Sequence, residues 1–191
     1  MGDMITIVSG LPRSGTSMMM RILEAGGLAV LTDGVRTPDA DNPNGYYEFA
    51  RVKHTREDSS WLVQAEGKVV KMVYKLLYDL PPDRPYSIIF MQRTLKEVVA
   101  SQAQMLARLG RVPAGTSDEH ALVGAFAAEV AAVRAWLRNR PCFRVLYVNY
   151  NRLLDAPTEP LAAVKAFLGG HLDEMAMRRV VDPRLYRQRM L

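Results

Sequence analysis

Short apolar runs recur along the chain, separated by segments in which apolar residues fall at helical spacing. Runs of this length are typical of strands buried on both faces of a parallel sheet. Strands that alternate with helices in this way predict an α/β fold, in which helices flank both faces of a single parallel sheet. We expect the strands at Met4–Ser9, Leu28–Leu31, Lys68–Val73, Ser87–Gln92 and Phe143–Val148.

The helical segments carry recognisable end signals. Gly26 and Gly27 predict the end of the first helix, because glycine is favoured at a helix C-cap. A long helix is expected from Asp118 to Arg140, with Ser117 as its N-cap, because Ala, Leu, Val and Trp recur there at spacings of three and four. Such a stripe indicates a helix that packs as a wall of the core, although the same alanines would also let a second subunit approach closely in a homodimer.

The first predicted strand leads into a glycine-bounded loop and then into a helix. Gly10 and Gly15 let backbone N–H groups converge on one point, where the helix N-terminus adds partial positive charge. The spacing matches a nucleotide-binding phosphate loop, except that Thr16 replaces the usual lysine and the cation stands earlier, at Arg13. The loop therefore suits an anion other than a magnesium-bound triphosphate. A strand-to-helix turn without a ligand is the alternative.

A second candidate anion contact follows the fourth predicted strand. Arg93 comes directly after that strand, at the edge where open α/β sheets bind ligands. Ser101 follows eight positions later, two turns along the next helix, so both side chains could reach one phosphate. The alternative is a solvated arginine and a serine that packs the helix.

Together these motifs resemble the cytosolic and bacterial sulfotransferases, which use 3′-phosphoadenosine 5′-phosphosulfate (PAPS) as sulfuryl donor. In that family a Pro-Lys/Arg-Ser-Gly-Thr loop grips the 5′-phosphosulfate, and an arginine and a serine eight residues apart grip the 3′-phosphate. Lys71 stands in the place of the family's catalytic lysine. The resemblance implies a P-loop nucleoside-triphosphate-hydrolase-like fold and a single sulfotransferase domain over residues 1–191. It assigns donor binding to Pro12, Arg13, Ser14, Gly15, Thr16, Ser17, Arg93 and Ser101.

The chain departs from the family pattern at the proton acceptor. Val73 stands where the soluble members have their general-base histidine. Glu48 is the replacement candidate, because the segment Asn42–Phe49 looks like the Asn-Pro-Xaa-Gly-aromatic-aromatic-Glu segment of many bacterial sulfotransferases. The flanking aromatic residues would partly desolvate this carboxylate and make it a better proton acceptor. The alternative is a carboxylate that pairs with Arg51 or Lys53 at a helix start.

The resemblance also implies the chemistry. A small-molecule or glycan acceptor would attack sulfur through a hydroxyl or amine, and Glu48 would take its proton. Arg13 and Lys71 would stabilise the charge that builds on the leaving 5′-phosphate. A sulfuryl group carries less charge than a γ-phosphate, so we expect no metal.

Two alternative functions remain open, and one motif of the family has no obvious counterpart in this sequence. The alternatives are a P-loop nucleotide kinase or nucleoside triphosphatase, and a module that binds the nucleotide without catalysis. The motif is the family's C-terminal Arg-Lys-Gly loop, which helps hold the 3′-phosphate in soluble members. The basic tail Arg184–Arg189 either substitutes for it or is a solvated end.

Composition narrows the classes of function. The chain has 191 residues, of which 49% are hydrophobic, which fits one domain with a substantial core. The net charge is +5, but the basic residues are dispersed and form no nucleic-acid-binding motif, so we expect no nucleic-acid partner. A single cysteine, Cys142, and three histidines without ligand spacing give no support to a metal site. No unbroken apolar run approaches the roughly 18 residues of a membrane span, so we expect a cytoplasmic protein.

Overall fold

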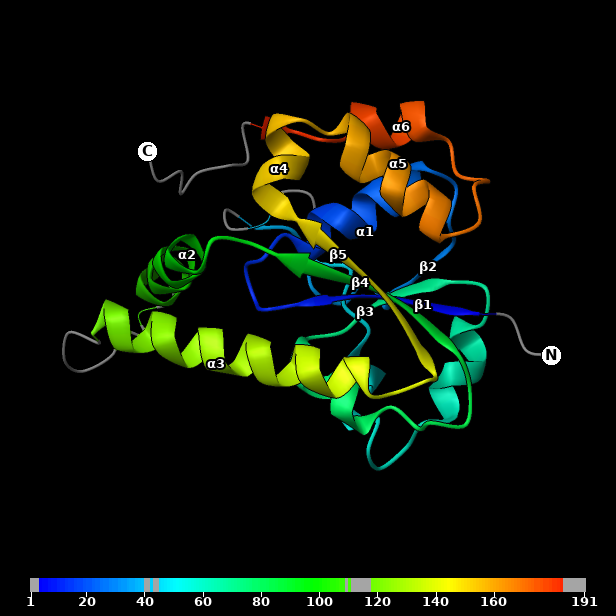
Figure 1. Ribbon diagram of the computed structural model, residues 1–191, viewed down its shortest axis with the longest axis horizontal. Coiled ribbons are helices and arrows are strands. Elements are labelled where there is room, and N and C mark those ends of the chain that lie inside the picture. Colours follow the sequence, from blue (N-terminus) through cyan, green and yellow to red (C-terminus); the bar gives the residue numbers. More distant parts are fainter. Residues whose placement is uncertain (1–3, 40–41, 43–44, 109, 111–117, 184–191) are drawn as a thin grey trace.

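A five-stranded parallel sheet forms the centre of the fold (Figure 1). The computed structural model describes residues 4–39, 42, 45–108, 110 and 118–183. The strands lie in the order β2-β3-β1-β4-β5, and every neighbouring pair is parallel. All the expected strands are present, so the predicted α/β class is confirmed. Their bounds are β1 Ile5–Gly10, β2 Val30–Leu31, β3 Val69–Lys71, β4 Tyr86–Gln92 and β5 Phe143–Asn149.

Helices cover both faces of this sheet. In Figure 1, α1, α4, α5 and α6 gather on one side of the strands, and α3 runs along the other side together with the short 3-10 helices. The α-helices are α1 Thr16–Ala25, α2 Leu95–Arg108, α3 Glu119–Arg138, α4 Tyr150–Asp155, α5 Thr158–Phe167 and α6 Glu174–Arg179. The 3-10 helices are η1 Ala50–His54, η2 Ser60–Ala65 and η3 Tyr74–Asp79.

Alternate residues of the two central strands enter two separate hydrophobic cores. Ile7 of β1 and Ile88 of β4 pack in the core that also contains residues of η2 and α3. Their neighbours Val8 and Ile89 pack in the core beneath α1, α5 and α6. All four side chains are fully buried. Both faces of these strands are therefore covered, as an unbroken apolar sequence predicts.

The long helix α3 differs from its prediction in two respects. Its N-cap is Asp118, whose carboxylate accepts a hydrogen bond from the His120 amide at 2.9 Å, whereas the expected cap, Ser117, lies outside the described residues. The helix packs against the core, as expected, but with only one face: Val133 and Leu137 are buried, and Phe126, Val130 and Trp136 are partly buried against the same core. Phe126, Val130, Val133 and Leu137 recur at spacings of three and four, so they form the inward face of the helix.

The composition of α3 also bears on the expectation that no segment spans a membrane. Among the described residues, it is the one helix long and apolar enough to cross a membrane, with 20 residues and a mean hydropathy of 1.3 over its best window. The helix contains no unbroken apolar run of that length, because Glu129 and Arg134 interrupt the apolar sequence. One such helix is weak evidence for a membrane span.

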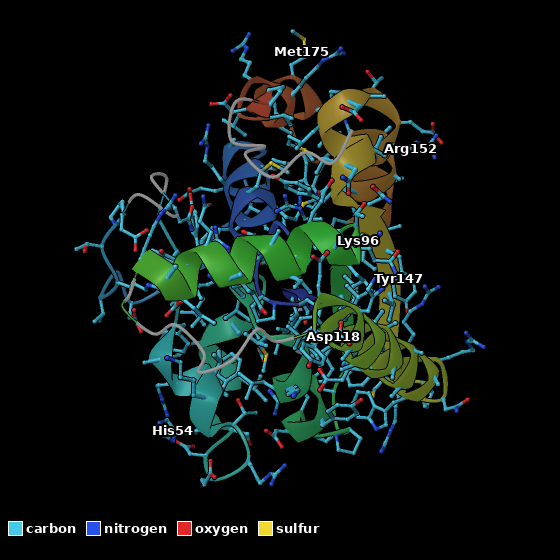
Figure 2. The ribbon with its side chains drawn as sticks, turned by 90° about the vertical axis from the view of Figure 1, so that its left-hand side faces the viewer. His54, Lys96, Asp118, Tyr147, Arg152 and Met175 are labelled. Carbon is cyan, nitrogen blue, oxygen red and sulfur yellow. The ribbon has the colours of Figure 1, made fainter. Side chains whose placement is uncertain are left out.

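Parallel strands end at the same edge of a sheet, and here that edge gathers the polar residues of the candidate motifs. The loop Leu11–Gly15 follows β1, Lys71 ends β3 and Arg93 follows β4. Figure 2 looks toward this edge and shows α2 crossing in front of it, between α1 and the 3-10 helices. This edge is where open α/β sheets bind their ligands.

Candidate active site

A cavity of about 360 Å³ opens at the carboxyl edge of the sheet. It is bordered by the glycine-bounded loop, the start of α1, the end of β3, α2 and the segment before η1. Nearly all the residues that the sequence predicts for the site line this cavity, from segments far apart in the chain. They are Pro12, Arg13, Gly15, Thr16, Ser17, Glu48, Lys71, Arg93 and Ser101.

Both glycines of the loop are required by its geometry. Gly15 is the N-cap of α1 and has φ 96°, and a Cβ there would lie 2.2 Å from Cδ2 of Tyr150. Gly10 has φ 149°, and a Cβ there would lie 2.6 Å from Ser14 Oγ and 2.7 Å from the Met91 carbonyl oxygen. Side chains at these positions would push the loop away from its supports. The first turn of α1 carries no acidic residue, so its partial positive charge is available to an anion.

Among the residues predicted to bind the sulfuryl donor, Ser14 is the one that does not line this cavity. Its hydroxyl is buried and has no hydrogen-bond partner among the described residues, and it borders a neighbouring cavity of about 310 Å³ between β4 and α3. The Ser14 amide is used within the loop, where it donates to the Leu11 carbonyl oxygen at 3.2 Å.

The two candidate anion motifs are in direct contact. Arg13 Nε donates a hydrogen bond to Ser101 Oγ at 2.9 Å. Arg93 Nη1 donates to the Arg13 carbonyl oxygen at 3.1 Å. Arg13 has a φ of 70°, which is uncommon for a residue with a side chain. The strand-end arginine therefore supports the anion loop at a point where its backbone is strained.

Arg93 lies in a largely buried polar cluster. Its Nε donates to Glu97 Oε2 at 2.9 Å, and the two side chains are only 7% and 3% exposed. Its guanidinium carbon lies 4.7 Å above the Tyr150 ring, and burial raises the pKa of the Tyr150 hydroxyl. Asn151 Nδ2 donates to both carboxylate oxygens of Glu97 at 3.1 Å. The carboxylate is thus held from two sides.

Lys71 occupies a more enclosed position than a surface lysine. Its Nζ donates to Ser17 Oγ at 3.3 Å and to the Tyr46 carbonyl oxygen. Burial lowers the pKa of Lys71 to about 8, an effect that the Glu48 charge opposes and the Arg36 charge reinforces. A buried cation beside a helix N-terminus is suited to an anionic ligand, which would restore its charged form.

Glu48 lines the cavity, but its surroundings differ from those expected. Its carboxylate forms an ion pair with Arg36 at 2.9 Å and is 29% exposed. The guanidinium of Arg36 stacks on Tyr46, 3.3 Å from the ring centroid. The neighbouring aromatic side chains are engaged elsewhere: Tyr47 donates to Glu24 at 2.6 Å, and Phe49 packs edge-on against Trp61. Of the three aromatic residues expected to flank Glu48, only Tyr46 lines the cavity with it.

The alternative pairing of Glu48 is also wrong. Arg51 pairs with Asp58 at 2.8 Å, so the carboxylate is not held at the start of η1 by this neighbour. Its actual partner, Arg36, belongs to the preceding loop. An exposed pair of this kind holds the carboxylate in place and is weak enough to exchange for another partner.

Comparison with known proteins decides the family. A family model described as "Sulfotransferase domain" matches residues 3–188. The chain belongs to the sulfotransferase family. No curated protein sequence matches it significantly.

Solved structures agree with this fold. The chain is similar to mouse sulfotransferase SULT7A1 complexed with PAP, with 16% identity, a TM-score of 0.52, and coverage of 94% of this chain and 62% of the mouse chain. It is also similar to sulfotransferase STF1 from Mycobacterium tuberculosis H37Rv, with 17% identity, a TM-score of 0.50, and coverage of 95% and 71%. The sulfotransferase domain from the curacin biosynthetic pathway shares 15% identity with a TM-score of 0.50, over 98% and 92% of the two chains. This chain therefore spans less than two thirds of the mouse structure.

Other features distinguish this sulfotransferase chain from the soluble family pattern. Val73, in place of the histidine, is 41% exposed and lines the cavity. His54, the nearest histidine in sequence to Glu48, does not line the cavity and lies on the outer surface away from α2 (Figure 2). The basic tail Arg184–Arg189, the candidate replacement for the family's C-terminal loop, lies outside the described residues. Within the described ranges, no three His, Cys, Asp or Glu residues are grouped to hold a metal ion.

Sequence reasoning missed the residues that support Arg93. Glu97 carried one available signal, because it lies in the first turn of the predicted helix, four positions after Arg93, a spacing at which opposite charges can pair. Asn151 and Tyr150 carried none that is specific, since their contact with Arg93 or Glu97 depends on where β5 and α4 lie relative to β4.

Proposed function

We propose that the protein transfers a sulfuryl group from PAPS to a hydroxyl or amine of a small-molecule or glycan acceptor. The observation that carries the proposal is the convergence of two anion motifs, Arg13 in the loop and Arg93 with Ser101, on one cavity. Membership of the sulfotransferase family supports it, as does the mouse structural neighbour, which was solved with PAP.

In this proposal the donor lies across the carboxyl edge of the sheet. The loop amides of Gly15, Thr16 and Ser17, at the N-terminus of α1, hold the 5′-phosphosulfate. Arg93 and Ser101 hold the 3′-phosphate through charge-assisted hydrogen bonds. Arg13, which lies between these groups, is within reach of either anion after it releases Ser101.

Transfer requires a base for the acceptor proton and positively charged or N–H groups that stabilise the leaving oxygen. Glu48 takes the proton from the acceptor as its oxygen or nitrogen bonds to sulfur and the bond from sulfur to the 5′-phosphate oxygen breaks. Lys71 and the loop amides stabilise the charge that develops on that oxygen. Arg36 engages the Glu48 carboxylate in the absence of an acceptor. This ion pair must therefore open or shift when the acceptor enters.

The donor site is tested by comparing two nucleotides. Calorimetry should show 3′-phosphoadenosine 5′-phosphate (PAP) binding at least about tenfold more tightly than adenosine 5′-monophosphate (AMP), since only PAP engages Arg93 and Ser101. Arg93→Ala should remove most of this preference. Equal affinity of the unaltered protein for the two nucleotides would contradict the proposal.

A second candidate is a module that binds the nucleotide without transferring the sulfuryl group. Two observations favour it: Val73 replaces the histidine, and Glu48 is engaged by Arg36. Incubation with PAPS and a panel of phenols, alcohols, amines and sugars separates the candidates. PAP release that depends on an acceptor supports the enzyme, whereas tight PAPS binding with no release under any acceptor supports the module.

A further inference from the structure

Glu97 is a buried carboxylate that the proposed transfer reaction does not use. It lies in the first turn of α2, and only 2% of the residue is exposed. Burying a carboxylate is costly unless it is both paired and hydrogen-bonded. Here Arg93 supplies the opposite charge at 2.9 Å, and Asn151 supplies a hydrogen bond to each carboxylate oxygen.

The partners of Glu97 determine how Arg93 can be oriented. Glu97 binds the Nε side of the guanidinium, and Nη1 of the same group donates to the Arg13 carbonyl oxygen. The face of the guanidinium lies over the Tyr150 ring. With its Nε edge and one face engaged by the protein, the planar group has one defined orientation at the wall of the cavity.

Asn151 fixes the carboxylate in turn. Its Nδ2 donates to Glu97, while its Oδ1 accepts a hydrogen bond from the Thr94 amide at 3.3 Å. The Asn151 amide cannot be reversed without losing that bond. Both oxygens of Glu97 must therefore accept hydrogen bonds: Oε2 from Arg93 and Asn151, and Oε1 from Asn151. A neutral glutamine has only one acceptor oxygen and cannot replace both.

We propose that Glu97 is the positioning residue that makes Arg93 selective for a nucleotide 3′-phosphate. The inference rests on the proposed donor site and extends it from the residue that touches the phosphate to the residue that aims it.

Electrostatics alone predicts the opposite effect of removing this carboxylate. If Glu97 only neutralised Arg93, then Glu97→Gln would raise the local positive charge and tighten the binding of any phosphate. If Glu97 orients Arg93, the substitution loosens PAP, because one of the two donors now faces an amide NH₂ group. The sign of the change in PAP affinity therefore separates positioning from charge balance.

The experiment is a double-mutant cycle with PAP and AMP as probes. We expect Glu97→Gln to weaken PAP about tenfold or more and to change AMP affinity by less than about threefold. In the Arg93→Ala background, Glu97→Gln should have no further effect on PAP, because the carboxylate acts through that arginine. Glu66→Gln is the matched control. The Glu66 carboxylate pairs with Arg84 at 3.7 Å and lines neither of the two cavities. Its substitution should leave the affinities for PAP and AMP unchanged.

Each outcome decides a separate point. Unchanged or tighter PAP binding by Glu97→Gln, in a protein that does prefer PAP to AMP, overturns the positioning role and leaves the donor site standing. Equal losses for PAP and AMP, or additive losses in the cycle, indicate a general structural role and also overturn it. No preference for PAP in the unaltered protein refutes the donor site itself.

A second variant keeps the test decisive if Glu97→Gln does not fold. Asn151→Ala removes the other support of the carboxylate and leaves the ion pair with Arg93 in place. We expect a smaller loss of PAP affinity, about threefold, with AMP affinity unchanged. Unchanged PAP affinity in a folded Asn151→Ala protein overturns the inference.

Discussion

Arg13 Nε donates a hydrogen bond to Ser101 Oγ across 88 positions of sequence, at 2.9 Å. This contact joins the loop after β1 to the inner face of α2. Both side chains line the same cavity, so the two anion motifs form one continuous surface rather than two separate sites.

Ser101→Ala tests that continuity. Ser101 is 5% exposed, so the alanine fills its place with little change in packing. The substitution removes the acceptor of the Arg13 bond and one proposed contact to the 3′-phosphate. We expect PAP affinity to fall by about 1–2 kcal/mol and AMP affinity to fall by less, as measured by calorimetry. An equal loss for both nucleotides would show that Ser101 serves only to hold Arg13.

Gly15→Ala tests the close approach of the loop to Tyr150. The new Cβ would lie 2.2 Å from the ring at a φ of 96°, so strain and steric overlap add. We expect a loss of about 2–4 kcal/mol in the free energy of unfolding, measured with urea. Gly27→Ala is the control, because its φ is 97° but, apart from its chain neighbours, no atom of the described residues lies within 4 Å of its Cβ position. It should cost about 1 kcal/mol, and equal costs at the two sites would contradict the steric argument.

The lowered pKa of Lys71 predicts how the stability of the nucleotide-free protein depends on pH. Its pKa is about 8 in the folded protein, against an ordinary value of 10.5 for a lysine in water. Between these values the unfolded chain binds a proton that the folded protein does not, so this residue's contribution to stability rises with pH across that window. Relative to Lys71→Met, the unaltered protein should gain about 1–3 kcal/mol from pH 7.5 to 10 in urea unfolding. A pH-independent difference would show that the lysine is not desolvated.

Glu48→Gln tests the proposed base. The amide retains the shape of the side chain but cannot accept the proton, so turnover should fall about 10²- to 10⁴-fold with PAP affinity nearly unchanged. The acidic limb of the rate profile should disappear with it. Arg36→Gln removes the partner of this carboxylate and should retain the acidic limb. Near-normal turnover in Glu48→Gln would place the base elsewhere, including on the acceptor itself.

The sequence alone determined the strands, the loop after β1 and the edge of the sheet at which the cavity lies. Parallel strands buried on both faces have unbroken apolar sequences. The bounds of β1 and β4 were therefore predicted to within one or two residues. Gly26 ended α1 as expected. Because parallel strands all end at one edge, the position of Arg93 directly after β4 was enough to place it beside the loop that follows β1.

Only the tertiary structure decided the partners of the charged groups. Glu48 was expected among aromatic residues, but it pairs with Arg36, and Arg93 is held by Glu97 and Asn151. Ion pairs and hydrogen bonds depend on the spacing of atoms to within a few tenths of an ångström. Neighbours in sequence do not set that spacing, since adjacent side chains on extended backbone point to opposite sides.

The same limit explains α3 and the coupling of the two motifs. An apolar helix does not reveal from its sequence how much of its surface neighbouring elements will cover. Val133 and Leu137 of α3 are buried and Phe126 and Val130 are partly buried on one face, while most of the remaining surface is exposed. The bond between Arg13 and Ser101 exists because β1 pairs with β4, which brings α2 beside the loop. Local periodicity decides which elements form, and the order of strands in the sheet decides which side chains meet.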